Sequence, residues 1–421
     1  MVLRQALVTA VLLTTSTSIV AQVDFEQHDW FYEFPLASTN VLPTVPPPSS
    51  FTWDSIFLPP GISLASAKRS PFHVYHPDFH RVIGEDPRLA LVLETEGYYS
   101  AHEAPVYHEP TQSFFFCSNA GAPLGFSGAE NSNRVFKISL DEVESSLSNK
   151  EGQVYLDETT GDWKAGNATL VEISGEDGTE GRLVNVNGDT RPADQIVFLA
   201  QGRGEEFPPT MTLVNPYPPY NSTVILNNYF GRQFNSLNDV ALHRGTGDLF
   251  FTDPDYGNSQ DFRPTPDLPL QVYRWNQTSG LVSLVADEMV RPNGIVFSPD
   301  ETKAYVADTG LVGKDRDPRR PATIYEYNVD EQGNWSDRRT FAFINTGVPD
   351  GLRCDESGNV WIAGTGDGVT VFNPQGVLLG KIFVGSGSAN FQWAGPGRMV
   401  ILAETKVYVA KLLANGDPVW K

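Results

Sequence analysis

The chain has 421 residues, of which 40% are hydrophobic and 11% aromatic, a composition that supports a large core and excludes overall disorder. Its 51 Asp and Glu residues outnumber 30 Lys and Arg residues, which gives a net charge of −21. Nucleic-acid phosphates are bound by clustered Lys and Arg side chains, and the sequence has no such cluster, so a nucleic-acid partner is excluded. Two cysteines are too few for a disulfide scaffold, and the fold must depend on its core.

Residues 1–22 have the layout of a secretory signal peptide. Arg4 precedes an apolar run over residues 6–13, which is followed by small polar residues and then by Ile19-Val20-Ala21. The Thr and Ser residues at 14–18 end the apolar run far short of the roughly 20 residues that a membrane-spanning helix needs. We therefore expect a secreted, extracellular protein without a membrane partner. The Asn-x-Ser/Thr sequons that fit a secreted glycoprotein are Asn167, Asn221, Asn276 and Asn334.

The amino-acid composition and pattern change at about residue 96. Residues 23–95 form a Pro-rich arm, in which the stretch from about 34 to 60 contains LPTVPPPSS and is expected to be extended with little regular structure. From residue 96 onward, short runs rich in Val, Ile, Phe, Tyr and Trp alternate with Gly, Asp, Asn and Pro clusters, as in GDLFFTDPDYG. This pattern is typical of strands of about 4 to 6 residues joined by tight turns, and it predicts an all-β fold without long helices, apart from a short turn near residues 139–146.

An internal repeat indicates how these strands are organised. Segments that start at Ser236, Arg291 and Val348 align, and each has a polar pair, an apolar strand, a turn with Asp or Gly and a second apolar strand. Looser copies near residues 102, 193 and 388 bring the number of units to six. Repeats of 40 to 60 residues with about four strands each are typical of a β-propeller. We therefore expect a six-bladed β-propeller over residues 96–421, with an N-terminal extension whose LALVLETEG stretch closes the ring.

The first strand of each blade lines the channel of a propeller, so polar residues that begin these strands face one cavity. Glu103, Asn238, Asn293 and Asp350 begin four of them, and the last three are 55 and 57 residues apart. Their oxygen-bearing side chains suit Ca²⁺ or another divalent cation that prefers oxygen. The alternative interpretation is that the NG and DG pairs are turn dipeptides. The recurrence of a polar residue at the same blade position favours a metal site.

The strings HEAPVY, LNDV, FFTDPDYG, RPNGIVFSPD, YVADT and GVPDGLRCDESGNVWIA resemble the senescence-marker/gluconolactonase (regucalcin-like) family of calcium-dependent six-bladed propellers, over about residues 96–410. SPFHVYHPDFHRVIG and FFFCSNAGAP are similar to its secreted fungal lactonohydrolase branch, which opens aldonate and pantoyl lactones. The residues that this resemblance assigns to the metal are Glu103, Asn293 and Asp350. It also implies that Asn238 lies beside the metal and contacts the ion or the substrate. Ala104 and Tyr107 depart from the Gly and Trp of many members and leave the ligand set intact.

The implied chemistry is hydrolysis of a small hydroxylated lactone, with no obligate protein partner. A bound divalent cation, Ca²⁺ or alternatively Zn²⁺, Mn²⁺ or Mg²⁺, polarises the carbonyl, and a carboxylate accepts a proton from the attacking water. Asp350 is the first candidate for this base, and His102 is the second, although its position on the strand favours packing between blades. The alternatives are an aryl-ester or phosphotriester hydrolase with the same site, and a non-catalytic ligand-binding propeller.

Other polar residues are expected to have structural roles. Asp253 and Asp308 end second strands and are expected to fix turns, and His243 is expected to be exposed in a turn. The mixed-charge loop GKDRDPRRP is expected to be solvated. Cys117 and Cys354 fall in different blades, too far apart for a disulfide, so two buried free thiols are expected.

Overall fold

The computed structural model of the chain describes residues 30–120, 125, 127–148, 155–174, 183–190 and 194–417. The predicted signal peptide at residues 1–22 lies outside the described residues. Within them, no helix is long and apolar enough to cross a membrane.

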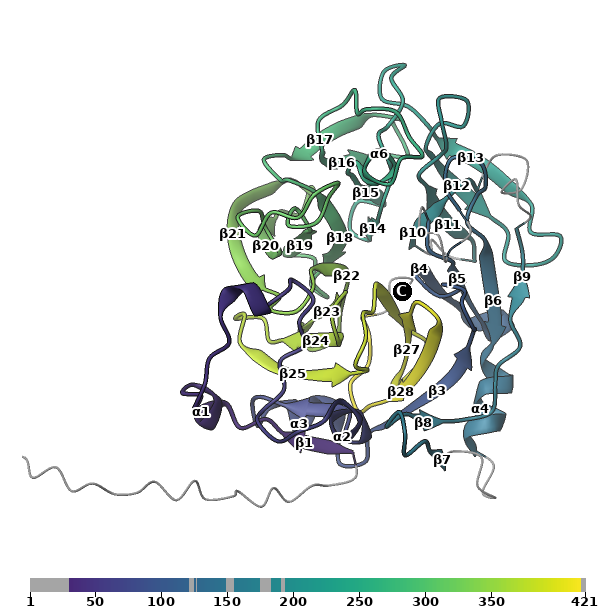
Figure 1. The fold of residues 1–421 in the computed structure, drawn as a ribbon. Helices are drawn as coiled ribbons and strands as arrows, with labels where there is room; N and C mark the ends of the chain where they lie inside the picture. Colours follow the sequence, from purple (N-terminus) through teal and green to yellow (C-terminus); the bar gives the residue numbers. More distant parts are fainter. Residues whose placement is uncertain are drawn as a thin grey trace, which may run out of the picture.

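The described strands form six sheets arranged around a central axis, which is the architecture of a six-bladed β-propeller (Figure 1). From inner to outer strand, blade 1 is β4 (Glu103–His108), β5 (Ser113–Cys117), β6 (Val135–Ser139) and β9 (Val171–Glu172). Blade 2 is β10 (Val186–Thr190), β11 (Ile196–Ala200), β12 (Thr210–Val214) and β13 (Ser222–Leu226). Blade 3 is β14 (Val240–His243), β15 (Asp248–Asp253), β16 (Gln271–Trp275) and β17 (Val282–Ala286).

The second half of the ring has longer strands. Blade 4 is β18 (Pro292–Phe297), β19 (Lys303–Asp308), β20 (Thr323–Val329) and β21 (Trp335–Phe343). Blade 5 is β22 (Pro349–Cys354), β23 (Val360–Gly364), β24 (Gly368–Phe372) and β25 (Leu378–Phe383). Blade 6 is β26 (Asn390–Trp393), β27 (Arg398–Ala403), β28 (Lys406–Lys411) and β3 (Arg88–Glu94). Adjacent strands within each blade are antiparallel, and each inner strand contacts the inner strands of both neighbouring blades.

Strands from the N-terminal part of the chain extend blades 5 and 6. β3 pairs antiparallel with β28, so blade 6 combines the two ends of the propeller sequence. β2 (Phe72–Val74) pairs with β25, and β1 (Phe31–Glu33) pairs with β2. Outside β3, the two-stranded ribbon of β8 (Trp163–Lys164) and β7 (Tyr155–Leu156) completes the sheet. The short helices are α1 (Leu36–Thr39), η1 (Pro48–Ser50), α2 (Leu64–Arg69), α3 (Phe79–Ile83), η2 (Glu109–Thr111), α4 (Leu140–Ser148) and α6 (Tyr256–Ser259).

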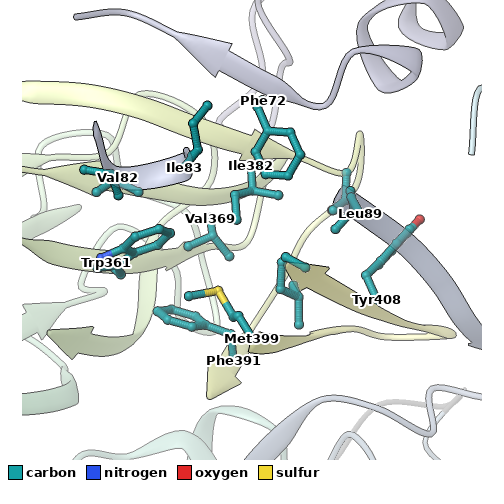
Figure 2. Close-up of a cluster of buried hydrophobic side chains, with 14 of the residues drawn as sticks. Phe72, Val82, Ile83, Leu89, Trp361, Val369, Ile382, Phe391, Met399 and Tyr408 are labelled. Carbon is teal, nitrogen blue, oxygen red and sulfur yellow. The ribbon is translucent and has the colours of Figure 1, made fainter. Parts of the chain in front are cut away.

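The core lies between the blades, because each sheet must bury both faces against its neighbours. Between blades 5 and 6, Trp361 and Phe391 pack with side chains of the N-terminal segment, including Phe72 and Ile83 (Figure 2). All four are at most 1% exposed. Burial of one such aromatic side chain stabilises the fold by about 1.5–3 kcal/mol, so this segment adds to the stability of the ring.

Two details differ from the sequence predictions. The second unit was expected to begin near residue 193, but its inner strand is β10 at residues 186–190, and the apolar run from Ile196 is the second strand, β11. His243 was expected to be exposed, but it ends β14 and is 2% exposed. Its ring packs 5.1 Å from the ring of Phe297 in blade 4, a contact between blades that the local sequence does not reveal.

Candidate functional site

Each blade presents one buried polar side chain at or near the start of its inner strand. The structure places the four predicted residues there, each at most 8% exposed, and adds two more. The six are Glu103, Asn187, Asn238, Asn293, Asp350 and Asn390, and we call them the polar ring. The four sequence-predicted site residues therefore lie at the same end of the channel.

Small residues in the inner strands bring the polar ring together. A side-chain Cβ on Gly188 would lie closer than 3.0 Å to the carbonyl oxygen of Asn238, and one on Gly294 would crowd Asp350 in the same way. A Cβ on Gly351 would crowd the side-chain amide of Asn390. The glycines of the NG and DG pairs therefore sit within strands, where they permit neighbouring inner strands to approach closely. They do not serve as turn dipeptides.

Backbone irregularities accompany these glycines. The pairing register shifts between Glu103 and Val106, between Pro292 and Ile295 and between Pro349 and Leu352, a bulge-like irregularity that includes the ring residue in each of blades 1, 4 and 5. Ala104 occupies the corresponding position in blade 1 with φ at 54°, a left-handed conformation that glycine adopts more easily. A bulge of this kind redirects a side chain, and here it occurs at each predicted metal ligand.

The two carboxylates of the ring are buried close to each other. The Asp350 carboxyl is within hydrogen-bonding reach of the Glu103 and Asn293 side chains. Burial raises the pKa of Asp350 to about 8, and burial together with the charge of Asp350 raises the pKa of Glu103. Within the described part of the chain, neither carboxylate has a Lys or Arg nitrogen within 4.0 Å. Two carboxyl groups therefore lie buried side by side, where ionisation of both is disfavoured unless a cation binds between them.

The amides of the ring differ in their partners. Asn390 donates from Nδ2 to Glu103 Oε2 at 2.7 Å and accepts the Phe391 N–H at 2.9 Å, so its orientation is fixed. Asn293 donates from Nδ2 to the Tyr256 hydroxyl at 2.8 Å. Asn238 is 2% exposed, and its Oδ1 is buried with no hydrogen-bond partner in the described structure. A buried acceptor without a partner costs about 1–3 kcal/mol, which indicates that a ligand completes its bonding.

The residues of the polar ring suit the calcium ion that the family resemblance implies. Glu103 and Asp350 supply two carboxylates, and Asn293 and Asn238 supply amide oxygens, a donor set that hard divalent cations prefer. A divalent cation would offset the buried negative charge and satisfy Asn238 Oδ1. Among the residues with described positions, no cluster contains three or more His, Cys, Asp or Glu side chains suited to a metal. The four ring residues fit a divalent cation because they combine two carboxylates with two amide oxygens.

A second polar cluster lies beside Glu103. His102 Nδ1 is 2.8 Å from Glu404 Oε1, in the β27–β28 connection of blade 6, so His102 packs between blades as expected. Asn119 Nδ2 donates to both oxygens of Glu404, at 3.3 and 3.2 Å. Burial disfavours protonation of His102, but the charge of Glu404 outweighs it and raises the pKa of His102.

A charged layer, formed by Arg353, Asp189 and Asp239, follows the polar ring along the inner strands. Arg353 Nη2 is 3.4 Å from Asp189 Oδ1, and Arg353 Nη1 is 3.9 Å from Asp239 Oδ2. Burial raises the pKa of Asp189 to about 8 despite this guanidinium. Beyond the layer, a cavity of about 60 Å³ is lined by Arg353, Gln392 and Arg244, on the side of the channel away from the polar ring. Arg353, Asp189 and Asp239 were not among the site residues predicted from the sequence.

The aspartates at the ends of the second strands fix turns, as expected. Asp253 accepts backbone N–H groups of Asn235 and Ser236 at 2.9 and 2.8 Å. Asp308 accepts those of Val290 and Arg291, each at 2.9 Å. Each carboxylate therefore holds the segment that leads into the ring residue of its own blade, Asn238 in blade 3 and Asn293 in blade 4.

The ring members that the prediction did not assign to the site are Asn187 and Asn390. Asn187 belongs to the string VNVNGDT, roughly one repeat length before Asn238, and its NG pair was the available signal. Its Oδ1 accepts a hydrogen bond from Gln201 Nε2 at 2.9 Å.

Comparison with known proteins finds similarity to one family. The profile described as "SMP-30/Gluconolactonase/LRE-like region" matches residues 213–403, which span blades 3 to 5 and parts of blades 2 and 6. The lactonohydrolase oryL of Aspergillus oryzae is 26% identical over 352 residues, covering 79% of this chain and 71% of that protein. A gluconolactonase of Zymomonas mobilis is 32% identical over 38% of this chain and 45% of that protein.

A solved structure shares the fold. A gluconolactonase from Xanthomonas campestris superposes with a TM-score of 0.60 at 23% identity, covering 82% of this chain and 95% of that one. At this identity the likeness concerns the fold alone, and it agrees with the six-bladed ring.

Proposed function

We propose that the chain, whose residues 213–403 match the SMP-30/Gluconolactonase/LRE-like region, opens hydroxylated lactones of the aldonate or pantoyl type with a divalent cation, Ca²⁺, held by the polar ring. The relatives whose names specify lactones support this substrate class. The single observation that carries the proposal is the set of two buried carboxylates and the unsatisfied Asn238 Oδ1 at one end of the channel. Glu103, Asn293 and Asp350 would hold the ion.

The ion, when bound, would polarise the lactone carbonyl and stabilise the oxyanion that forms on attack by water. The protein's own residues perform the remaining tasks. Asp350 in its ionised form accepts a proton from the attacking water, because it combines a carboxylate with a position in the ring. Asn238 donates and accepts hydrogen bonds, so it can pair with a hydroxyl of the lactone ring.

The composition of the ring favours a hydroxylated substrate. All six ring members carry amide or carboxylate groups, and these polar groups need partners when the site excludes water. A lactone with ring hydroxyls supplies such partners, whereas a phosphotriester with apolar arms does not. This reasoning supports lactones over phosphotriesters as substrates.

The test is hydrolysis of a panel of sugar lactones and pantoyl lactone, followed in a pH-stat, with the variant Asp350→Asn. We expect this variant to lose at least about 100-fold in kcat/KM, since general base catalysis typically contributes 10²–10⁴-fold. The matched control is Asp355→Asn, which changes a buried aspartate in the same blade that bonds Asn359 and Trp361 instead of the ring. A folded Asp350→Asn protein with near-normal activity would refute the role of Asp350.

We also propose that the protein is secreted, with residues 1–22 removed as a signal peptide. N-terminal sequencing of protein from the culture medium of a eukaryotic host should find a start close to residue 23. A mature protein that retains Met1 would contradict this proposal.

A further inference from the structure

One ring member, Asn293, is held by a tyrosine from the neighbouring blade. Tyr256 begins α6, the short helix in the connection between β15 and β16 of blade 3. Its hydroxyl accepts the hydrogen bond from Asn293 Nδ2 at 2.8 Å. The two residues are 37 positions apart in the sequence, so this bond links blade 3 to blade 4 at the ring.

The hydrogen bonds beyond Tyr256 have a single consistent direction. The Tyr256 hydroxyl also bonds the hydroxyl of Thr309, which is 1% exposed. The Thr309 hydroxyl in turn lies 3.4 Å from the carbonyl oxygen of Arg291, which can only accept. Thr309 therefore donates to Arg291, Tyr256 donates to Thr309, and Asn293 donates to Tyr256. This order directs the NH₂ end of the Asn293 amide toward Tyr256, and leaves its oxygen for another partner.

The ring of Tyr256 is itself held in place. The guanidinium of Arg291 lies 5.1 Å from the centre of the Tyr256 ring. That guanidinium donates from Nε to Asp255 Oδ1 at 2.7 Å and from Nη1 to the carbonyl oxygen of Val312. Arg291 is 7% exposed, so it has little freedom to release the ring. The orientation of Asn293 is thus specified by buried contacts on two sides.

We propose that Tyr256 is a positioning residue, which fixes the Asn293 amide with its oxygen available to the cation and so sets the affinity of the ring for that ion. The inference rests on the proposed function, because it assumes that the polar ring binds a divalent cation. Partners of this kind, which orient a metal ligand from outside the coordination sphere, typically contribute 10–100-fold to metal affinity.

The experiment measures Ca²⁺ binding to chelator-stripped full-length protein by titration calorimetry. Tyr256→Phe removes the hydroxyl alone, and we expect Ca²⁺ to bind about 10-fold more weakly. Thr309→Val removes the hydroxyl that accepts the hydrogen bond from Tyr256. We expect this variant to bind Ca²⁺ more weakly as well, but with a smaller loss of affinity than Tyr256→Phe. The control is Tyr273→Phe in the same blade, where the lost hydroxyl accepts from Gln271 Nε2 at 2.6 Å away from the ring. This control should bind Ca²⁺ as the unmodified protein does.

A kinetic measurement separates positioning from substrate contact. With excess Ca²⁺, lactone hydrolysis by Tyr256→Phe should recover to within about twofold of the unmodified rate, because only the affinity for the ion has changed. Unchanged Ca²⁺ affinity in Tyr256→Phe, or a rate loss that excess Ca²⁺ does not restore, would overturn the inference and leave the proposed function in place. Failure of the unmodified protein to bind Ca²⁺ would overturn both.

Discussion

The close approach of the inner strands can be tested by adding one methyl group at Gly351. In Gly351→Ala, the new Cβ would lie closer than 3.0 Å to three atoms of the Asn390 side chain. Asn390 is 1% exposed and bonded at both ends of its amide, so it cannot move aside without breaking a hydrogen bond. The substitution therefore acts on the contact between blades 5 and 6 and on the support of Glu103.

The expected loss of stability follows from two effects. Overpacking of a tight site costs about 1–3 kcal/mol. Loss of the Asn390–Glu103 hydrogen bond, which involves a carboxylate, adds about 1.5–3 kcal/mol. A partial shift of the strand would reduce both the overpacking and the loss of the hydrogen bond. We therefore expect Gly351→Ala to lower the free energy of unfolding by about 2–4 kcal/mol.

Urea unfolding in the presence of a chelator measures this loss without a contribution from bound metal. The matched control is Gly166→Ala, where the new Cβ meets only the Ser146 Cβ at 3.4 Å, an ordinary van der Waals contact. The control should change the free energy of unfolding by less than about 1 kcal/mol. If Gly351→Ala proved as stable as this control, the glycines would not be needed for close approach, and the account of the ring would be wrong.

Two further predictions concern groups away from the ring. Burial lowers the pKa of His73 to about 3. Between about pH 3 and 6.5, the unfolded chain therefore binds a proton at this residue that the folded protein does not bind. The stability that depends on neutral His73 is complete above pH 6.5 and declines as the pH falls. Free energies of unfolding from urea denaturation at pH 4 to 6 should show that His73→Gln has a shallower pH dependence, by up to about 1.4 kcal/mol per pH unit, and equal slopes would contradict the burial of a neutral imidazole. Cys117 and Cys354 are both buried free thiols, so titration of the denatured, unreduced protein should find two reactive groups, and finding none would show that they pair.

The fold could be predicted because its signal is periodic. A polar residue, a strand, a turn and a second strand recur at nearly constant spacing, and this repetition follows from blades that each perform the same packing. Asn238, Asn293 and Asp350 could be aligned for the same reason. Asn187 escaped the alignment because its unit was recognised by the apolar second strand from Ile196, which is the more hydrophobic part of blade 2.

The specific partners in contacts between blades could not be predicted, because they join residues far apart in sequence. The bond between Asn293 and Tyr256 and the burial of His243 against Phe297 both cross from blade 3 to blade 4. The glycines of the NG and DG pairs have the same sequence signature in a turn and in a crowded strand. Only the position of the neighbouring blade distinguishes the two uses.

The polar ring is proposed to hold a divalent cation that lactone hydrolysis requires. The most direct measurement is the pH-stat rate of the unmodified protein with glucono-lactone and pantoyl lactone, before chelation, after chelation and after Ca²⁺ is added back. We expect the rate to fall to the uncatalysed background after chelation and to return with Ca²⁺. A rate that survives complete removal of divalent metal, or no hydrolysis of any lactone with Ca²⁺ present, would contradict it.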